Sequence, residues 1–341
     1  MINVGLSGFG LAGRILHTPL IKAAGMRIAA VATRRVNEVA TVLPGAAAVA
    51  SYRELLDRDD VDLIVVVTPN DLHTSQALEA LHAGKHVVVD KPMCVHAAEA
   101  DQLIALAADR GLQLAVFHNR RWDSDFLTIE KLVNSGRLGE VHSYAARWDR
   151  YRPEVQDRWK DRPGPGSGLL YDLGSHLVDQ VLRLFGRPEW VQADVFAQRP
   201  GSRVDDGFEV LLGKGRLRIT LGASLFSSDT RLRYRINGEQ AAFVKNGLDP
   251  QEDQLRAGVD PLAADFGAEP AENFGTLVRG KDGSIATIAS EHGRWLSFYE
   301  GMRHSIERNE PVPVAAADAR AVLEVIEAAM QSSSSGRRIS L

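Results

Sequence analysis

The chain has 341 residues, of which 45% are hydrophobic and 25% are charged, and its formal net charge at pH 7 is −4. This composition is typical of a folded globular protein, and the length exceeds what one ordinary core holds, so we expect two domains. A small negative charge gives no electrostatic footprint for nucleic acid or for an anionic membrane. No apolar run approaches the roughly 20 residues of a membrane helix.

The single cysteine, Cys94, excludes an intrachain disulfide, which fits a reducing compartment. No basic segment followed by a long apolar stretch opens the chain, so we expect no secretory signal and a cytoplasmic location. No cluster of Cys and His has the spacing of a zinc site, and we predict no metal.

The first part of the chain predicts a dinucleotide-binding turn. Apolar segments at 2–6 and 28–32 predict two strands, and residues 14–24 predict a helix between them. A G-x-G-x-x-G motif in this context binds a diphosphate at the helix N-terminus, where unpaired N–H groups favour an anion. The alternative is an ordinary turn between strand and helix. The residues that we assign to the cofactor here are Gly8, Phe9, Gly10, Leu11, Ala12 and Gly13.

The residues after the second strand indicate which nucleotide binds. NAD-binding proteins usually place an acidic residue about 20 positions past the motif, where it binds a ribose hydroxyl. Counted from Gly13, that position is Thr33 (33 − 13 = 20), which Arg34 and Arg35 follow, and the next carboxylate is Glu38. A hydroxyl and two guanidinium groups suit a 2′-phosphate, so we predict NADP in preference to NAD. The alternative is a pair of solvated arginines at a strand end.

Strand and helix patterns alternate up to about residue 120. The further elements that we expect there are strands at 61–68, 86–90 and 112–117, and helices at 53–57, at 70–83 with Asn70 as its N-cap, and at 96–110. Repeated strand–helix units predict a mostly parallel sheet with helices on both faces. We therefore predict an α/β fold class, with a doubly wound Rossmann domain over residues 1–120.

The pattern changes after residue 120, where strands dominate. The expected elements are a helix at 124–135, strands at 141–151 and 190–197, hairpins that turn at Gly213-Lys214-Gly215 and at Asn237-Gly238, a long excursion at 250–273, and a helix at 317–330 with a solvated serine-rich exit. We predict that residues 121–341 form a C-terminal α+β domain with a large, mostly antiparallel sheet, which binds substrate and mediates oligomerisation.

Two short polar segments follow expected strands of the first domain. Ligands of doubly wound sheets bind outside the carboxyl ends of the strands, so we predict that both segments contact the cofactor. Lys91 at the edge of the cofactor could polarise the oxygen on which charge develops. Taken alone, these segments could also be a helix cap and a solvated strand end. The residues concerned are Thr68, Pro69, Asn70 and His73 in the first segment and Asp90, Lys91 and Pro92 in the second.

A glycine-rich loop at 164–168 leads into an expected helix that carries Asp172 and His176. Their spacing of four residues places them on one face. A histidine with its ordinary pKa of about 6.5 suits proton transfer to or from an alcohol oxygen, and a carboxylate one turn away could orient it. Taken alone, such a pair is more often a surface pair or half of a metal site than a catalytic couple.

These motifs, in this order, resemble the glucose–fructose oxidoreductase / inositol dehydrogenase family. The resemblance implies that Lys91, Asp172 and His176 form the catalytic group, with Asp90 in place of a more usual glutamate. Segments 116–126 and 148–154 are similar to the branch that contains NADP-dependent scyllo-inositol dehydrogenases. That similarity implies reversible oxidation of a secondary alcohol on a cyclic polyol or sugar.

The resemblance also implies a substrate pocket and an oligomer. The pocket residues that we predict, besides Lys91, Asp172 and His176, are Arg120, Arg121, Trp122, Arg150 and Trp159, with the cofactor residue Asn119 beside them. Trp122 and Trp159 could equally belong to the core. We expect a homodimer or homotetramer formed through the second sheet, and no nucleic-acid or membrane partner.

Two other functions remain open at this point. A non-catalytic, nucleotide-sensing regulator would be expected to lose Lys91, Asp172 or His176, and all three are present. A lyase or glycosidase could use the same residues for a transient, NAD(P)-dependent oxidation.

Overall fold

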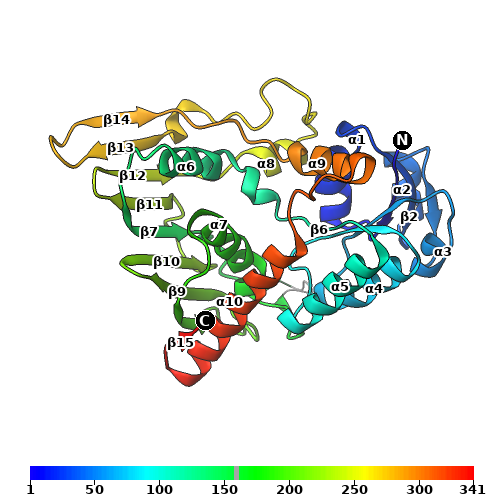
Figure 1. The fold of residues 1–341 in the computed structure, drawn as a ribbon, viewed down its shortest axis with the longest axis horizontal. Coiled ribbons are helices and arrows are strands. Elements are labelled where there is room, and N and C mark those ends of the chain that lie inside the picture. Colours follow the sequence, from blue (N-terminus) through cyan, green and yellow to red (C-terminus); the bar gives the residue numbers. More distant parts are fainter. Residues whose placement is uncertain (157–160) are drawn as a thin grey trace. The chain divides into compact units, whose positions relative to one another are not determined.

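The computed structural model describes residues 1–156 and 161–341, which divide into two compact units (Figure 1). Unit 1 contains Met1–Asn119, Gln251–Phe266 and Arg294–Arg320. Unit 2 contains the remaining segments, Arg120–Pro250, Gly267–Gly293 and Ala321–Leu341. The division of the sequence at residue 120 into a nucleotide domain and a substrate domain stays a prediction.

Unit 1 is built on a six-stranded parallel sheet of order β3-β2-β1-β4-β5-β6. Its strands are β1 (Asn3–Ser7), β2 (Arg27–Ala32), β3 (Ala47–Val49), β4 (Leu63–Val66), β5 (His86–Val89) and β6 (Leu114–Val116). The apolar residues of β4 and β5 are fully buried, as expected for central strands covered on both faces. This strand order is that of a doubly wound dinucleotide-binding sheet, and the predicted Rossmann fold is confirmed.

Seven α-helices are described in unit 1. They are α1 (Thr18–Ala23), α2 (Val36–Val42), α3 (Tyr52–Leu56), α4 (His73–His82), α5 (Ala97–Arg110), α8 (Gln251–Arg256) and α9 (Leu296–Arg308). The predicted N-cap at Asn70 is wrong: a 3-10 turn, Asn70–Leu72, precedes α4, and Leu72 occupies the cap position. The reason is local, because the His73 N–H bonds to the Asn70 carbonyl and tightens this turn before the α-helix begins.

Helices α8 and α9 come from the part of the sequence that follows the expected hairpins. The pattern predicts only a long excursion at 250–273, and α8 lies inside it. The Gln251 side chain accepts a hydrogen bond of 2.7 Å from the Trp295 backbone N–H, which joins the two late segments of unit 1. α9 packs against α1, next to the glycine-rich turn. These helices thus complete the first unit with residues that lie far away in the sequence.

Unit 2 is built on a nine-stranded sheet of order β14-β13-β12-β11-β7-β10-β9-β8-β15. Its strands are β7 (Val141–Arg147), β8 (Trp190–Phe196), β9 (Gly207–Lys214), β10 (Leu217–Ser224), β11 (Leu232–Gly238), β12 (Ala241–Asn246), β13 (Gly275–Arg279), β14 (Ile285–Ile288) and β15 (Ile339–Ser340). All neighbours are antiparallel except β7 and β10. The predicted, mostly antiparallel sheet of an α+β domain is confirmed.

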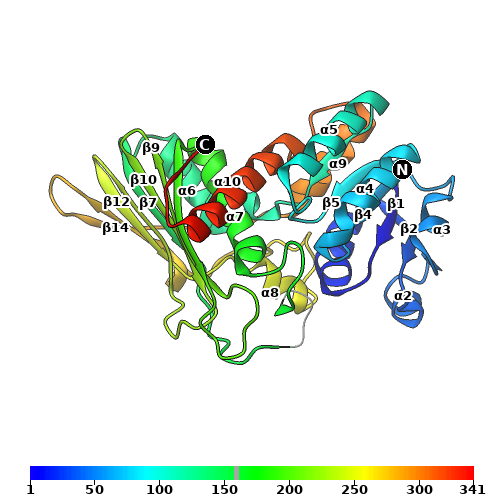
Figure 2. The same cartoon turned by 90° about the horizontal axis from the view of Figure 1, so that it is seen from below.

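Helices cover one face of this sheet. Figure 2 shows α6 (Ser124–Asn134), α7 (Ser175–Phe185) and the later part of α10 (Ala316–Ser335) on the same side of the strands. Along β9, Phe208, Val210 and Leu212 are buried, with period two. The core of unit 2 therefore lies between this face and the helices, and oligomerisation through the sheet stays a prediction.

The hairpin turn that the sequence predicts at Asn237-Gly238 lies two residues later in the structure. β11 continues through Gly238, and the chain reverses at residues 239–240. A Cβ atom on Gly238 would lie 2.1 Å from the Leu138 carbonyl oxygen. The glycine is thus needed for a close backbone approach inside the sheet and not for the turn. The other hairpin also reverses later than predicted, after Lys214.

The prediction that a solvated, serine-rich segment follows residue 330 is also wrong, because α10 continues to Ser335. Ser332 is buried, and its hydroxyl accepts a hydrogen bond of 3.0 Å from the Ala193 N–H. Ser333 accepts one of 2.9 Å from the Val195 N–H. The serines therefore dock the end of the helix onto β8. None of the helices in the described residues is both long and apolar enough to cross a membrane.

Candidate functional site

The glycine-rich turn after β1 has the shape that a dinucleotide requires. Gly8 has a φ of +101°, and a Cβ atom there would lie 2.7 Å from the Val67 carbonyl oxygen. A Cβ atom on Gly13 would lie 2.6 Å from the Gly8 carbonyl oxygen, whereas Gly10 has no neighbouring atom within 4 Å of its Cβ position. Gly8 and Gly13 thus allow the backbone to fold tightly, and Gly10 faces space that a diphosphate could fill. These residues fit the predicted cofactor.

A helical segment follows this turn without a break. Residues Ala12–His17 form a π-helical turn and continue into α1. The Arg14 N–H bonds to the Gly10 carbonyl at 3.0 Å, so the helix starts within the motif. π-helical turns inside helices occur frequently at functional sites.

Two arginines pair with one carboxylate, Glu38, in unit 1. Glu38 pairs with Arg35 at 3.1 Å and with Arg14 at 3.3 Å. Arg34 is exposed, and among the described residues no ion pair of its side chain is found. The Thr33 hydroxyl accepts a hydrogen bond from the Arg35 N–H at 3.1 Å. The negative charge of Glu38 is therefore compensated within the protein, and Arg34 remains available for an external anion.

His73 joins the two polar segments that follow β4 and β5. Its Nδ1 lies 2.8 Å from the Pro92 carbonyl oxygen, and its Nε2 lies 2.9 Å from the Thr68 carbonyl oxygen. The ring is 1% exposed. Both of its nitrogen atoms are thus used to hold the segments together, so a cofactor role for His73 would be indirect.

The Asp90 carboxylate, which precedes Lys91, is connected through polar contacts to two buried side chains, His17 and Tyr299. The Asp90 carboxylate accepts a hydrogen bond of 2.7 Å from the Lys91 N–H, and its other oxygen lies 3.7 Å from Nε2 of His17. Nδ1 of His17 lies 2.5 Å from the Tyr299 hydroxyl. Burial opposes ionisation of Asp90, but the neighbouring His17, Lys91 and His73 outweigh it and hold the pKa of that carboxyl below its usual value. Asp90 is therefore a fixed anion beside the predicted catalytic lysine.

The second predicted group lies in unit 2, where the glycine-rich loop enters a helix. Residues Leu170–Gly174 form another π-helical turn, and α7 continues it. Asp172 lies on this turn and lines a small pocket that is open to solvent. The residues that line the pocket are Arg150, Arg152, Asp161, Gly168, Leu169, Asp172, Asp205 and Leu225. Two cations and three carboxylates give it many donors and acceptors, as recognition of a polyhydroxylated ligand would require.

His176 lies in the first turn of α7 and is 6% exposed. Its ring centroid lies 5.8 Å from that of Trp148. Trp148 follows β7 directly and is buried like the alternate residues Tyr144 and Ala146 of that strand. The guanidinium of Arg120 lies 4.2 Å from the Trp148 ring, and that of Arg233 lies 4.8 Å from it. Trp148 therefore packs between the histidine and two cations. The sequence analysis does not assign it to the site, although the period of two from Tyr144 places it on the covered face.

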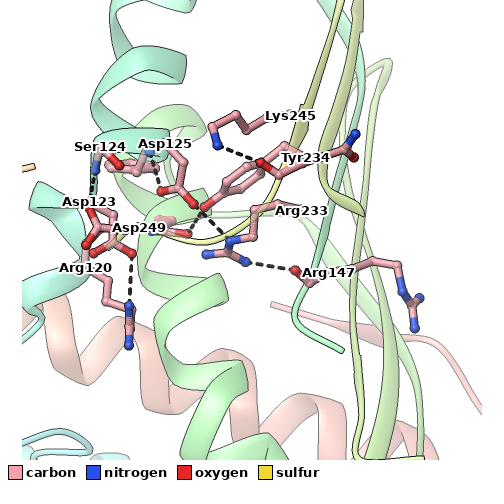
Figure 3. Close-up of polar contacts among 12 residues, drawn as sticks. Arg120, Asp123, Ser124, Asp125, Arg147, Arg233, Tyr234, Lys245 and Asp249 are labelled. Atoms are coloured by element: carbon pink, nitrogen blue, oxygen red, sulfur yellow. Dashed lines mark hydrogen bonds and ion pairs between the residues drawn. The ribbon is translucent and has the colours of Figure 1, made fainter. Parts of the chain in front are cut away.

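Arg233, which lies against Trp148, belongs to a group of buried charges (Figure 3). Arg233 and Asp125 pair at 3.2 Å, with side chains 1% and 0% exposed. Arg233 also donates a hydrogen bond of 3.0 Å to the Arg147 carbonyl. Breaking a buried pair by removing one partner costs several kcal/mol. This pair therefore holds Arg233 in one place beneath the ring that contacts His176.

The arginines predicted to line the pocket differ in their surroundings. Arg121 forms a buried, two-pronged ion pair with Asp179, with bonds of 2.6 and 2.9 Å. Arg120 pairs with Asp123 at 3.3 Å, and Arg150 lines the pocket. Asn119 is buried in unit 1 and Trp122 is half-buried, while Trp159 lies outside the described residues. Their roles toward a ligand stay predictions, and of this set Arg150 lies on the pocket itself.

Asp205 is a pocket residue that the sequence analysis misses. Its carboxylate accepts a hydrogen bond of 2.7 Å from the Leu170 N–H, and its carbonyl accepts one of 3.0 Å from the Leu169 N–H. Burial raises the pKa of Asp205 to about 6, with the charge of Asp206 acting in the same direction. Nothing in the sequence around this residue marks it, because its partners lie 35 positions away.

No group of three or more His, Cys, Asp or Glu side chains that could hold a metal ion is found among the residues that the structure describes.

Both parts of the chain match the models of one protein family. Residues 2–118 match an oxidoreductase family's NAD-binding Rossmann fold, and residues 130–341 match that family's C-terminal alpha/beta domain.

Individual relatives align along the whole chain. It is 41% identical to scyllo-inositol 2-dehydrogenase (NADP(+)) IolW of Bacillus subtilis, with 100% of this chain and 96% of the relative covered. It is 39% identical to the uncharacterized oxidoreductase YdgJ of Escherichia coli, with 97% and 96% covered. The solved structure of yvaA from Bacillus subtilis has a TM-score of 0.97 at 40% identity and covers 100% of this chain and 98% of its own.

We expect Asp205→Asn to stabilise the fold at alkaline pH. The pKa of this carboxyl rises from 3.8 to about 6 on folding, so the ionised form is disfavoured. That cost is fully present above the folded pKa and is lost as the pH falls below about 4. At about 1.4 kcal/mol per pKa unit, the free energy of unfolding should rise by about 2–3 kcal/mol at pH 8. Urea unfolding of the wild type and the variant at pH 8 and pH 4 measures this change. An equal difference in the free energy of unfolding at both pH values would contradict the raised pKa of Asp205.

Proposed function

The chain belongs to the glucose–fructose oxidoreductase / inositol dehydrogenase (Gfo/Idh/MocA) family, as its motifs predict. We propose that it is an NADP-dependent dehydrogenase of a cyclic polyol. The observation that carries this proposal is the pocket lined by Asp172, whose helix presents His176 one turn later. A relative that is 41% identical over the whole chain bears the name of an NADP-dependent scyllo-inositol dehydrogenase. Its name supports the choice of a ring polyol as the substrate.

The residues of unit 1 would hold the cofactor. The motif from Gly8 to Gly13 would bind the diphosphate, and Arg34 would bind the 2′-phosphate. A compensated Glu38 supports the preference for NADP, since an uncompensated carboxylate would repel that phosphate. When bound, the nicotinamide supplies the acceptor or donor for the hydride.

The residues of the catalytic group would manage the proton and the charge on oxygen. His176 would take the proton of the substrate hydroxyl during oxidation and return it during reduction. Asp172, four residues earlier, would orient the imidazole or bind a neighbouring hydroxyl. Lys91 would stabilise the charge that develops on the oxygen, while the anion of Asp90 keeps the backbone at Lys91 fixed.

The first test is the reaction of the wild-type protein. We expect reduced nicotinamide to form when a cyclic polyol such as scyllo-inositol is supplied with NADP⁺, and to form more slowly with NAD⁺. Inositol isomers and aldoses, each tested with both cofactors by absorbance, would identify the preferred ring. A protein that oxidises none of these compounds with either cofactor would overturn the proposed function.

We expect Arg34→Ala to weaken the binding of NADPH without weakening that of NADH. A hydrogen bond to a charged group is worth about 1.5–3 kcal/mol, so the dissociation constant of NADPH should rise roughly tenfold to a hundredfold. Titration calorimetry with both cofactors measures the two effects. Arg53→Ala is a matched control, because Arg53 is an exposed arginine of the same unit that pairs with Asp57 at the end of its own helix, α3. Equal losses for both cofactors would contradict the phosphate role.

We expect His176→Ala to lower kcat while the protein still binds NADPH. General acid–base catalysis contributes about 10²–10⁴-fold, which sets the size of the loss. His142→Ala serves as a control, because His142 is a half-exposed histidine on β7 of the same unit. Near-normal turnover by His176→Ala would remove His176 from the mechanism and leave Lys91 as the candidate proton carrier.

A further inference from the structure

The segment between β8 and β9, residues 197–206, contacts both sides of the pocket in unit 2. We call it the β8–β9 connector. It ends in the pair Asp205-Asp206 and contains the buried Arg199. The lining residues at the start of the helix are Gly168, Leu169 and Asp172, and we call them the helix wall. The other lining residues besides Asp205 are Arg150, Arg152, Asp161 and Leu225, and we call them the loop wall.

Asp205 attaches the connector to the helix wall. It accepts the N–H groups of Leu169 and Leu170, at 3.0 and 2.7 Å, where the helix that carries Asp172 begins. A Cβ atom on Gly168 would lie 1.8 Å from one carboxylate oxygen of Asp205. Only a glycine allows this approach, so the position of the helix start depends directly on that of Asp205.

Arg199 attaches the connector to the loop wall. Its guanidinium donates hydrogen bonds to the carboxylate of Asp161 at 3.2 Å and to the carbonyls of Arg152 and Glu154 at 3.3 and 3.1 Å. Its Nε donates to the carboxylate of Asp206 at 2.9 Å. The Arg199 side chain therefore bonds to two residues of the loop wall, Arg152 and Asp161, and to Glu154.

Asp206 links the two attachments. Its side chain accepts the N–H groups of Gln198 and Arg199, at 2.6 and 3.1 Å, and its carbonyl accepts the Leu225 N–H at 2.9 Å. Because it follows Asp205 directly in the chain, a single peptide unit joins the two attachments.

The Arg199–Asp206 pair is costly to bury and difficult to replace. Their side chains are 1% and 0% exposed. A buried ion pair often contributes little net stability, because desolvation offsets the attraction. The planar fork of a guanidinium serves several acceptors in fixed directions, which a lysine ammonium cannot reproduce. The geometric specificity of this pair is therefore a better account of its presence than stability.

We propose that Asp205 and the Arg199–Asp206 pair are positioning residues that set the distance between the helix wall and the loop wall of the substrate pocket. Asp205 acts on the reaction rate through Asp172 and His176, and Arg199 acts on substrate affinity and selectivity through Arg152 and Asp161. This inference rests on the proposed function of the pocket as the polyol site.

The test compares kinetic constants of paired variants on the polyol that the wild type prefers. A displacement of about 1 Å in a catalytic group can cost on the order of 100-fold, so Asp205→Ala should lower kcat about 10- to 100-fold with a smaller change in KM. Asp205→Asn keeps an oxygen that accepts the Leu170 N–H, so it should recover most of this loss. Arg199→Lys should instead raise KM by about tenfold and change the ranking of inositol isomers, as expected when binding common to ground and transition states is lost.

The control is Arg203→Ala, which removes an exposed arginine from the same connector. It should leave both constants unchanged, and all variants should bind NADPH like the wild type. If Arg199→Lys matches Arg203→Ala in KM and in selectivity, or if Asp205→Asn loses as much kcat as Asp205→Ala, the positioning roles are overturned. Reduced thermal stability with unchanged kinetic constants would also overturn them, because it would assign the residues to the fold alone.

Amide hydrogen exchange gives a readout that does not need turnover. Asp205→Ala should speed exchange in peptides that cover residues 169–172, and Arg199→Lys should do so in peptides that cover 150–154 and 225. Arg203→Ala should leave both regions as protected as in the wild type. If the wild type oxidises no polyol, the proposed function fails, while this experiment still decides whether the connector fixes the two walls. Unchanged exchange in both variants would overturn the inference.

Discussion

Close approach of backbone at a few glycines is the constraint on which both candidate sites depend. At Gly8 the chain passes so near to Val67 that a Cβ atom would lie 2.7 Å from its carbonyl oxygen, and at Gly168 the obstacle is the Asp205 carboxylate at 1.8 Å. Both glycines have a positive φ, which other residues rarely adopt. Each lies just before a helix that opens with a π-helical turn. The glycines thus fix where these helices begin, and the functional side chains follow.

Buried charge is the second feature that shapes unit 2. The pairs Arg233–Asp125, Arg199–Asp206 and Arg121–Asp179 all have side chains no more than 6% exposed. A hydrophobic replacement is often neutral or stabilising for such pairs, so stability alone does not explain them. Two of these pairs instead hold a group near the candidate site: Arg233 lies against Trp148, and Arg199 holds the loop wall. Unit 2 therefore uses ion pairs to give a mixed polar pocket a defined shape.

The sequence predicts the fold of unit 1 well, because its signals are local. The motif from Gly8 to Gly13, the apolar strands and the helix-ending Gly111 each follow from a few adjacent residues, and the six-stranded parallel sheet agrees with them. The Asn70 cap is an error with a local cause, whereas two errors in unit 2 occur where a distant contact overrides a local preference. Asn237-Gly238 favours a turn, but the approach of Leu138 uses this glycine inside a strand. The serines after residue 331 favour solvent, but β8 offers them hydrogen-bond partners.

The same distinction explains which site residues the sequence can indicate. Asp172 and His176 can be predicted as site residues because their spacing is local and a family resemblance supports it. Asp205 and Arg199 act through partners that lie 35 or more positions away, and neither stands in a motif. A residue that holds other residues in place does so through contacts that form only when the chain folds, so the local sequence does not reveal it. Candidate catalytic groups can therefore be predicted from a sequence sooner than the residues that we propose position them, and the latter require the structure.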